Sequence, residues 1–334
     1  MRQGTCISAS RSTLLRRIDR VQRTDPRDGQ RAARPDVIRV LCDKLCACCH
    51  RIEQDALMSF TDVYGRTDCL DGDTLDAIAT RLDARRESTR YMDMLHEYLD
   101  LLDLKAARRV LVLGCGTGVE VRVLVEHPEF DGHVTALDVS EPLVLRAEEN
   151  FRAAGIVADV RWSVGDARAL ELADGQFDLV VAHTLISHVP DPGRVVEEAA
   201  RVTRPGGTVV VFDGDHATLT FGTLDLAEGR NMDDKIVDAL IANPRIMRSL
   251  PRLAKRTGLR LTDSRAWVLS EVGVADFFLP ALHSYRRLLP AAGVLTSEEA
   301  DAFVADPLRT HGDGTFFAAT SFHAMVWHKK IGDD

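Results

Sequence analysis

Short continuous apolar runs recur through the middle of the chain, and stretches with apolar residues at helical spacing separate them. Such runs are typical of strands that are buried on both faces. Their alternation with helical stretches, such as 142–154 and 193–203, predicts repeated βα units and therefore a parallel, doubly wound sheet. The five predicted strands span 110–113, 133–137, 159–163, 177–182 and 208–212.

The first run leads into a loop dense in glycine, GCGTG at 114–118, and then into a helical pattern that starts at Val119. A strand, a glycine turn and a helix in this order form the first crossover of a nucleotide-binding α/β sheet. Glycine permits the sharp reversal and lets a ligand approach bare backbone. The helix N-terminus then offers unpaired N–H groups to that ligand.

Two further strands are predicted at 260–270 and 315–328, with helical stretches between them. The predicted fold class is α/β: a doubly wound, mostly parallel seven-stranded sheet with an N-terminal helical extension and a helical insertion (214–258) after strand five. We expect a helical segment at 73–104 before the first strand. The predicted parts are a disordered or helical extension (1–57), a helical cap (58–104), a ligand-binding core (105–213), and substrate-covering helices with the last two strands (214–334).

Four cysteines and His50 lie close together at 42–50. Their spacing, C-x3-C-x-C-C-H, matches none of the paired C-x2-C zinc patterns, and no second pair follows. We therefore predict no metal site. Met58 is an alternative start, which would make the preceding residues an upstream extension.

The composition narrows the class of partner. The chain has 334 residues, of which 45% are hydrophobic, and a net charge of −9, which argues against a nucleic-acid partner held through phosphates. No apolar run approaches the ~18 residues that span a membrane, and the N-terminus lacks the apolar segment of a secretory signal. Seven cysteines in a chain this long make no disulfide framework and favour a reducing cytoplasm. We expect a cytoplasmic protein with a small-molecule substrate, and the oligomeric state stays open.

Three features of the sequence narrow the class of ligand that the glycine loop can bind. Its spacing is G-x-G-x-G rather than the G-x-G-x-x-G of dinucleotide sites. Glu120 falls in the first turn of the helix, where a carboxylate repels phosphates and favours an amino or sulfonium group. Asp138 follows the second strand, where a carboxylate can accept both ribose hydroxyls, and Asp166 with Ala167 follows the third, suited to an adenine. A nucleoside without phosphates fits this set better than NAD.

The segments LGCGTG, ALDVS, GDARAL, FDLVVAHTLISHVPDP and RVTRPGGTVVVFD together resemble the class I S-adenosylmethionine-dependent methyltransferases. They are most similar to the small-molecule branch that resembles the ubiquinone/menaquinone biosynthesis (type 11) methyltransferases. The resemblance covers 104–213 well and the remainder loosely. It implies a Rossmann-like fold, S-adenosyl-L-methionine as cofactor, bound by 105–213, and in-line methyl transfer to O, N or C of a small organic metabolite.

The resemblance also implies roles for individual residues. The glycines of the loop would line the methionine end of the cofactor, Asp138 would bind the ribose, and Asp166 with Ala167 the adenine. His183 would lie beside the sulfonium and the substrate. The implied cofactor-binding residues are Gly114, Cys115, Gly116, Gly118, Asp138, Val139, Asp166, Ala167 and His183.

Three histidines are candidate catalytic bases, because an oxygen acceptor must lose a proton and histidine titrates near neutrality. His183, His188 and His216 all follow strands at their carboxyl ends, where open α/β sheets bind ligands. His183 has the best position, His188 can instead brace the following loop, and each can make a structural hydrogen bond. Asp213 and Asp215 beside His216 also permit a metal site, although nothing in the pattern demands one.

Two other functions stay open. A catalytically inactive cofactor-binding subunit that acts through a partner would keep the same glycine loop, Asp138 and Asp166. A nicotinamide oxidoreductase would bind NAD tightly, which Glu120 and the glycine spacing oppose. Tyr64 and Tyr91, upstream of the loop, would cover a bound ligand or simply pack. The substrate is expected under 214–258 and the helices between 274 and 306.

Overall fold

The computed structural model describes residues 62–331. The predictions for 1–57, including the cysteine cluster at 42–50 and the role of Met58, lie outside these residues. No described helix has the length and apolar character needed to cross a membrane.

A seven-stranded sheet forms the centre of the described chain, in the order β3-β2-β1-β4-β5-β7-β6. The first five strands are parallel, and β7 pairs antiparallel with both β5 and β6. The predicted fold class is thereby confirmed. The strands are β1 (Arg109–Leu113), β2 (His133–Asp138), β3 (Val160–Val164), β4 (Phe177–His183), β5 (Thr203–Phe221), β6 (Leu259–Gly273) and β7 (Phe316–Lys329).

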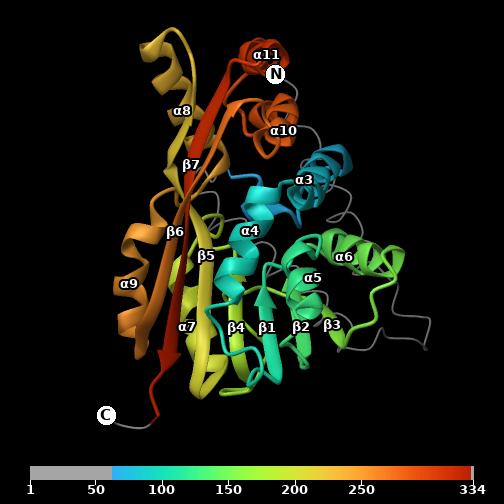
Figure 1. Cartoon of the computed structure of the whole chain (residues 1–334), viewed down its shortest axis with the longest axis vertical. Helices are drawn as coiled ribbons and strands as arrows, with labels where there is room; N and C mark the ends of the chain where they lie inside the picture. Colours follow the sequence, from blue (N-terminus) through green and yellow to red (C-terminus); the bar gives the residue numbers. More distant parts are fainter. Residues whose placement is uncertain (1–61, 332–334) are drawn as a thin grey trace, which may run out of the picture. The chain divides into compact units, whose positions relative to one another are not determined.

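Helices cover both faces of this sheet (Figure 1). Because side chains of a strand alternate between faces, Val110 and Val112 of β1 join one apolar cluster, while Leu111 and Leu113 join a second. The first cluster includes α4 and α5, and the second includes α7 and α9. The helices are α3 (Gly72–Ala84), α4 (Thr89–Leu99), α5 (Val119–Glu126), α6 (Glu141–Ala153), α7 (Pro192–Val202), α8 (Leu226–Leu240), α9 (Ile246–Arg256), α10 (Phe278–Ala291) and α11 (Ser297–Asp313), with two 3-10 turns, η1 (Tyr64–Arg66) and η2 (Arg85–Glu87).

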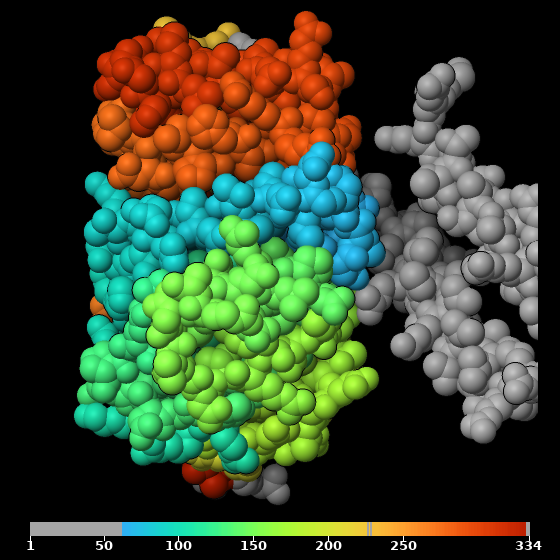
Figure 2. Space-filling view, turned by 90° about the vertical axis from the view of Figure 1, so that its right-hand side faces the viewer, coloured from blue at the N-terminus to red at the C-terminus, as the bar shows by residue number. Residues whose placement is uncertain are grey.

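Helices α3, α10 and α11 lie beyond the carboxyl ends of the parallel strands (Figure 1). Helix α10 packs on both α3 and α11. Figure 2 shows this contact from the side, with the orange surface of the C-terminal helices next to the blue surface of the α3 region. Arg287 of α10 pairs with Asp71, the residue that caps α3, at 2.7 Å. Residues far apart in the sequence thus form one cap over the ends of the strands.

Two of the predicted elements differ from the structure. The helical segment expected at 73–104 is two helices, because Ser88 leaves the helical conformation and its side chain accepts a hydrogen bond from Tyr91 N, which starts α4. The insertion expected to be helical from residue 214 begins as strand: β5 continues to Phe221 because it stays paired with β7. The sequence 214–221 carries no continuous apolar run, so the apolar pattern did not predict that the strand extends through these residues.

Candidate functional site

A cleft opens where β1, β2, β3 and β4 end, and we call it the glycine-loop cleft. It holds about 1000 Å³ of empty space, part of it open to solvent. Parallel strands end at one edge of the sheet, and in open α/β folds that edge is where ligands bind. All of the predicted cofactor-binding residues except Gly118 line it: Gly114, Cys115, Gly116, Asp138, Val139, Asp166, Ala167 and His183.

The glycine loop turns sharply between β1 and α5. Gly114, Gly116 and Gly118 all have positive φ, at 71°, 48° and 86°, a region that side chains disfavour. A Cβ atom at Gly114 would lie 2.9 Å from Leu185 Cδ1. Gly118 caps α5 and lies behind the cleft, packed against α6 and β3. The loop therefore needs glycine for its backbone and for the space around it.

Two carboxylates face the cleft from the neighbouring strands. Asp138 is 7% exposed; its Oδ2 accepts a hydrogen bond from Gly116 N and its Oδ1 one from Ser140 N, both at 2.9 Å. Each oxygen keeps a second acceptor position for a ligand hydroxyl. Asp166 pairs with the guanidinium of Arg168, with Oδ2 at 2.9 Å from Nη2. The loop and the end of β2 thus hold each other in place at the cleft.

Two ionisable side chains in the cleft leave polar atoms without partners. Oε1 of Glu120 and Nε of Arg85 are buried and make no hydrogen bond among the described residues. Burial raises the pKa of Glu120 to about 8. Arg85 donates from Nη1 to Thr184 Oγ1 at 3.0 Å, and Thr184 has an unusual positive φ of 45°. An orphaned acceptor and an orphaned donor in one cleft are suited to a ligand that carries both an ammonium and a carboxylate.

His183 ends β4 and is buried beneath the cleft. Its Nε2 lies 2.7 Å from the hydroxyl of Tyr91, its Nδ1 lies 3.2 Å from that of Tyr98, and its ring stacks on Phe212. Arg85 donates from Nη1 to the hydroxyl of Tyr91 at 3.3 Å, and a neutral His183 donates at one ring nitrogen and accepts at the other. Burial lowers the pKa of His183 to about 3. The ring is therefore neutral, and both of its nitrogens are already hydrogen-bonded.

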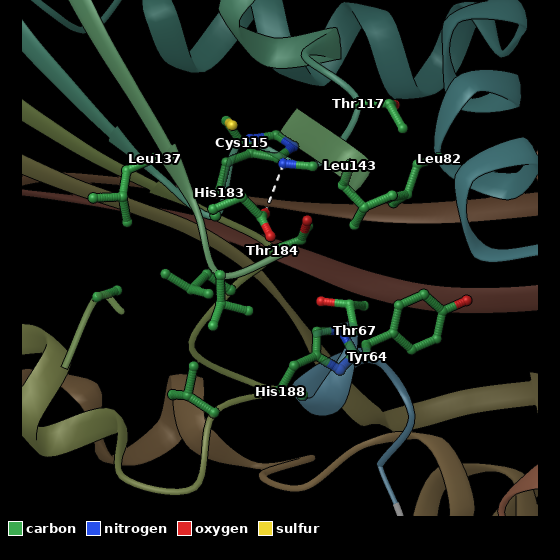
Figure 3. Close-up of a pocket in the computed structure, with 18 of the residues that line it drawn as sticks. Tyr64, Thr67, Leu82, Cys115, Thr117, Leu137, Leu143, His183, Thr184 and His188 are labelled. Atoms are coloured by element: carbon green, nitrogen blue, oxygen red, sulfur yellow. Dashed lines mark hydrogen bonds between the residues drawn. The ribbon is translucent and has the colours of Figure 1, made fainter. Parts of the chain in front are cut away.

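His188 stands at the other side of the cleft, beside Tyr64 and opposite Cys115 and Thr117 (Figure 3). Its Nδ1 lies 2.9 Å from Oδ2 of Asp62, which is 1% exposed. Asp62 also accepts hydrogen bonds from backbone N–H groups, including that of Ala242 at 2.8 Å. A carboxylate accepts, so Nδ1 of His188 donates to Asp62, and in the neutral form of the ring Nε2 holds the lone pair.

His216 lies at a different cavity, on the extended part of β5. Its Nε2 is 3.4 Å from Asp213 Oδ1 without forming a good hydrogen bond. Asp213 instead holds Ser187 through its backbone N and its hydroxyl, and Asp215 pairs with Arg248 at 2.7 Å. Among residues 62–331, no group of three or more His, Cys, Asp or Glu side chains is arranged to hold a metal ion. The two aspartates near His216 thus have structural partners.

A second cavity adjoins the glycine-loop cleft, with about 590 Å³ of empty space that includes open solvent. Its lining comes from η1, α3 and η2 and from β5, α8, α10 and β7. Tyr64, Arg85 and His188 line both the cleft and this cavity. These three residues therefore mark the junction between the two.

Three functional residues were missed in the sequence: Arg85 of the junction, Asp62, which holds His188, and Arg81 of the second cavity. None belongs to a motif of the sheet, since all three precede β1 and reach the site only because the cap folds over the strand ends. A weak signal existed for the arginines, which recur at helical spacing beside the apolar positions of α3.

Comparisons with known proteins show the family of the chain. Residues 111–211 match the family described as a methyltransferase domain. The chain is 37% identical over 145 residues to a phosphatidylethanolamine N-methyltransferase of Cereibacter sphaeroides, which covers 41% of this chain and 70% of that protein. An uncharacterized 37.1 kDa protein of a Streptomyces fradiae transposon is 31% identical over 257 residues, covering 75% of this chain and 69% of the other.

The fold recurs in solved structures. A candidate methyltransferase from Bacillus halodurans superimposes with a TM-score of 0.51 at 17% identity, over 71% of this chain and 99% of that one. The matched family segment runs from β1 into β5 and contains the glycine loop, Asp138, Asp166 and His183. The orphaned Glu120 and Arg85 suit the amino acid end of S-adenosylmethionine, and the second acceptor positions of Asp138 suit its ribose. The chain belongs to the type 11 family of class I S-adenosylmethionine-dependent methyltransferases, with S-adenosylmethionine as its cofactor.

Proposed function

We propose that this methyltransferase acts on a small organic acceptor that binds in the second cavity and loses a proton during the reaction, as a hydroxyl does. The observation that supports this most is the junction: His188, held by Asp62, lines both the cleft and the second cavity. S-adenosylmethionine supplies a methyl group that is already activated on a sulfonium sulfur and open to in-line displacement by the acceptor. The chain then has to align the acceptor, exclude water and take up its proton.

His188 is the base in this proposal. Its Nε2 has a free lone pair at the boundary between the two cavities, within reach of an acceptor in one of them. Asp62 fixes the tautomer and would stabilise the imidazolium that forms, as the carboxylate does in other histidine dyads. Tyr64 packs on the ring of His188 with centroids 4.9 Å apart and keeps it oriented.

His183 has a positioning role in this proposal, although its place in the sequence favoured it as the base. A ring with a pKa of about 3 and both nitrogens hydrogen-bonded takes up no proton near neutrality. It links Tyr91 to Tyr98 and so fixes the hydroxyl that accepts from Arg85. His216 lines only the second cavity and would contact the acceptor.

For the cofactor, we propose that Asp138 binds the ribose and Asp166 with Ala167 the adenine. Glu120 would accept from the ammonium and Arg85 would donate to the carboxylate of the methionine end. These roles use the acceptor positions of Asp138 and the unpaired atoms of Glu120 and Arg85. Cys115 and Val139 line the same cleft and would make van der Waals contacts with the cofactor.

Replacing Asp138 with alanine should weaken cofactor binding by ~1–3 kcal/mol, the usual cost of losing a charged hydrogen-bond partner. Titration calorimetry with S-adenosylhomocysteine measures this loss. Asp166→Ala serves as a comparison at the adenine end. An unchanged affinity of Asp138→Ala would refute the placement of the ribose.

Cofactor affinity should rise with pH between about 6 and 8 because of Glu120. In the free protein the pKa of this carboxyl is about 8, so it is mostly protonated at neutral pH. An ammonium beside it lowers that pKa, so binding releases a proton and becomes tighter as pH rises, by up to about tenfold per unit until it levels off above 8. Calorimetry at several pH values measures how steeply the affinity for the cofactor changes with pH. Glu120→Gln should remove it, and a slope that persists in this variant would place the ammonium elsewhere.

A thermal-shift comparison followed by a transfer assay tests the proposed function. We expect stabilisation by S-adenosylhomocysteine and none by NAD, because Arg85 and Arg168 are the only arginines or lysines that line the cleft among residues 62–331, and Arg168 is paired with Asp166. Labelled S-adenosylmethionine incubated with a metabolite extract should yield a labelled small molecule. Stabilisation by NAD alone would favour an oxidoreductase, and cofactor binding without any transfer would favour an inactive subunit. A cytoplasmic location and the absence of a nucleic-acid partner remain predictions from the composition.

A further inference from the structure

We propose that the second cavity recognises an organic oxyanion, a carboxylate or a phosphate carried on an apolar body, and that Arg81 pairs with it. This inference depends on the proposed function for one point, that the acceptor binds in the second cavity. It names the class of acceptor that the cavity would take.

The ionisable side chains of the cavity are unbalanced in charge. Among residues 62–331, two arginines, Arg81 and Arg85, line it and no aspartate or glutamate does. Asp213 and Asp62 lie behind the lining, where they face His216 and His188. The positive charge of the lining contrasts with the net charge of −9 of the whole chain. A small cavity with guanidinium groups and no carboxylate favours an anion and disfavours an ammonium.

Arg81 is partly buried and has no anionic partner. Among residues 62–331, its side chain donates from Nη1 to the hydroxyl of Tyr64 at 2.5 Å and also hydrogen-bonds to Tyr285, and the side chains that act on its charge are tyrosines rather than carboxylates. A guanidinium has five N–H donors, so most of its capacity is unused. A buried cation without a counter-ion is costly, and such a site gains most from an anion that arrives with the ligand.

Two tyrosine rings hold the guanidinium in place. Its Cζ lies 5.4 Å from the centroid of Tyr64 and 5.7 Å from that of Tyr285, distances at which a cation is attracted to the face of a ring. Tyr285 lies on α10 and Tyr64 on η1, so both halves of the cap position Arg81. The group is thus oriented before a ligand binds, which suits paired hydrogen bonds to an oxyanion.

The two arginines have different surroundings, which separates their roles. Arg85 lines the glycine-loop cleft as well as the second cavity. Glu120 lines the same cleft, and the positive charge of Arg85 acts on its carboxyl group. Arg81 lines the second cavity and not the cleft. We therefore assign Arg81 to the acceptor and leave Arg85 to the methionine end.

The rest of the wall indicates an apolar body for the ligand. Aromatic side chains from α10 and β7 and aliphatic ones from α8 and β5 surround the space. Two polar atoms interrupt this wall. Oγ1 of Thr320 has no hydrogen-bond partner among residues 62–331, and Nε2 of His216 lies 3.4 Å from Asp213 Oδ1. They offer a place for a hydroxyl on the ligand. The apolar lining consists of Leu219, Ile236, Leu240, Ile241, Phe277, Phe278 and Phe322.

Calorimetry with the protein saturated with S-adenosylhomocysteine tests the proposal with three probes: benzoate, its neutral isostere benzamide, and phenyl phosphate. We expect at least one of the two anions to bind about tenfold or more tightly than benzamide. Tighter binding of benzoate would identify a carboxylate, and tighter binding of phenyl phosphate a phosphate. Equal affinity for all three, or no binding of either anion, would overturn the proposal.

Variants of Arg81 connect the preference to this residue. Arg81→Gln should abolish the preference for anions, whereas Arg81→Lys, which keeps the charge, should retain part of it. Arg86→Gln is the matched control, because Arg86 lies on η2 and lines neither the cleft nor the second cavity. A preference that survives in Arg81→Gln would contradict the assignment. Affinity for S-adenosylhomocysteine, measured on each variant, confirms folding and reports on the proposed function separately.

Discussion

Replacing His188 with asparagine should lower kcat for methyl transfer by about 10²–10⁴, the range that a positioned general base contributes. The affinity for S-adenosylhomocysteine should stay within a few fold, because the loss affects the proton and not the cofactor. Asparagine can still accept or donate at the position of Nδ1 beside Asp62, so the fold of the junction should be retained. Steady-state transfer of label, with calorimetry on the same preparation, measures both quantities.

Two further variants separate the base from residues that merely support the site. Asp62→Asn should also lower kcat strongly, because an amide that donates to Nδ1 moves the proton of His188 to Nε2. His183→Phe keeps an aromatic ring stacked on Phe212 and should reduce kcat less than His188→Asn. The assignment is wrong if His188→Asn keeps full activity while His183→Phe abolishes it.

Replacing Gly118 with alanine should destabilise the protein by about 2–5 kcal/mol. The positive φ of 86° costs ~1–2 kcal/mol for a residue with a side chain, and forcing an extra methyl group into a packed core adds ~1–3 kcal/mol. Its Cβ would lie 3.1 Å from Ala147 Cβ, 3.2 Å from Trp162 Cη2 and 3.3 Å from Phe151 Cε2. Urea unfolding of the free protein gives the free energy directly.

Gly155 provides the control for this prediction. Its φ of 66° is also positive, yet a Cβ there would meet no heavy atom within 4 Å. Gly155→Ala should therefore show the backbone cost alone, ~1–2 kcal/mol. Equal losses at the two glycines would mean that the space behind the loop contributes nothing.

The core of the fold was predictable because its signals are local. The run at 110–113, the glycine loop and the carboxylates after strands two and three lie in register along the chain, and in the structure they meet at one edge of the sheet. A parallel sheet brings the ends of its strands together whatever the loops do. The residues that end those strands could therefore be placed at a common site from the sequence.

The junction was not predictable in the same way. Asp62 contacts His188 across 126 positions of the chain. Arg81 of α3 contacts the ring of Tyr285, which lies on α10. Such contacts depend on how α3 and α10 pack, which periodicity does not specify. The roles of the histidines also depend on burial: His183 had the expected position, but its tyrosine partners and its low pKa are properties of the packed core.

A crystal structure with S-adenosylhomocysteine would test the proposed site most directly. We predict the adenine beside Asp166 and Ala167, the ribose hydroxyls on Asp138, and the amino acid end between Glu120 and Arg85. The sulfur should then face the junction that His188 lines. A ligand bound in the reverse direction, or in the second cavity beside Arg81, would contradict both the cofactor placement and the role of His188.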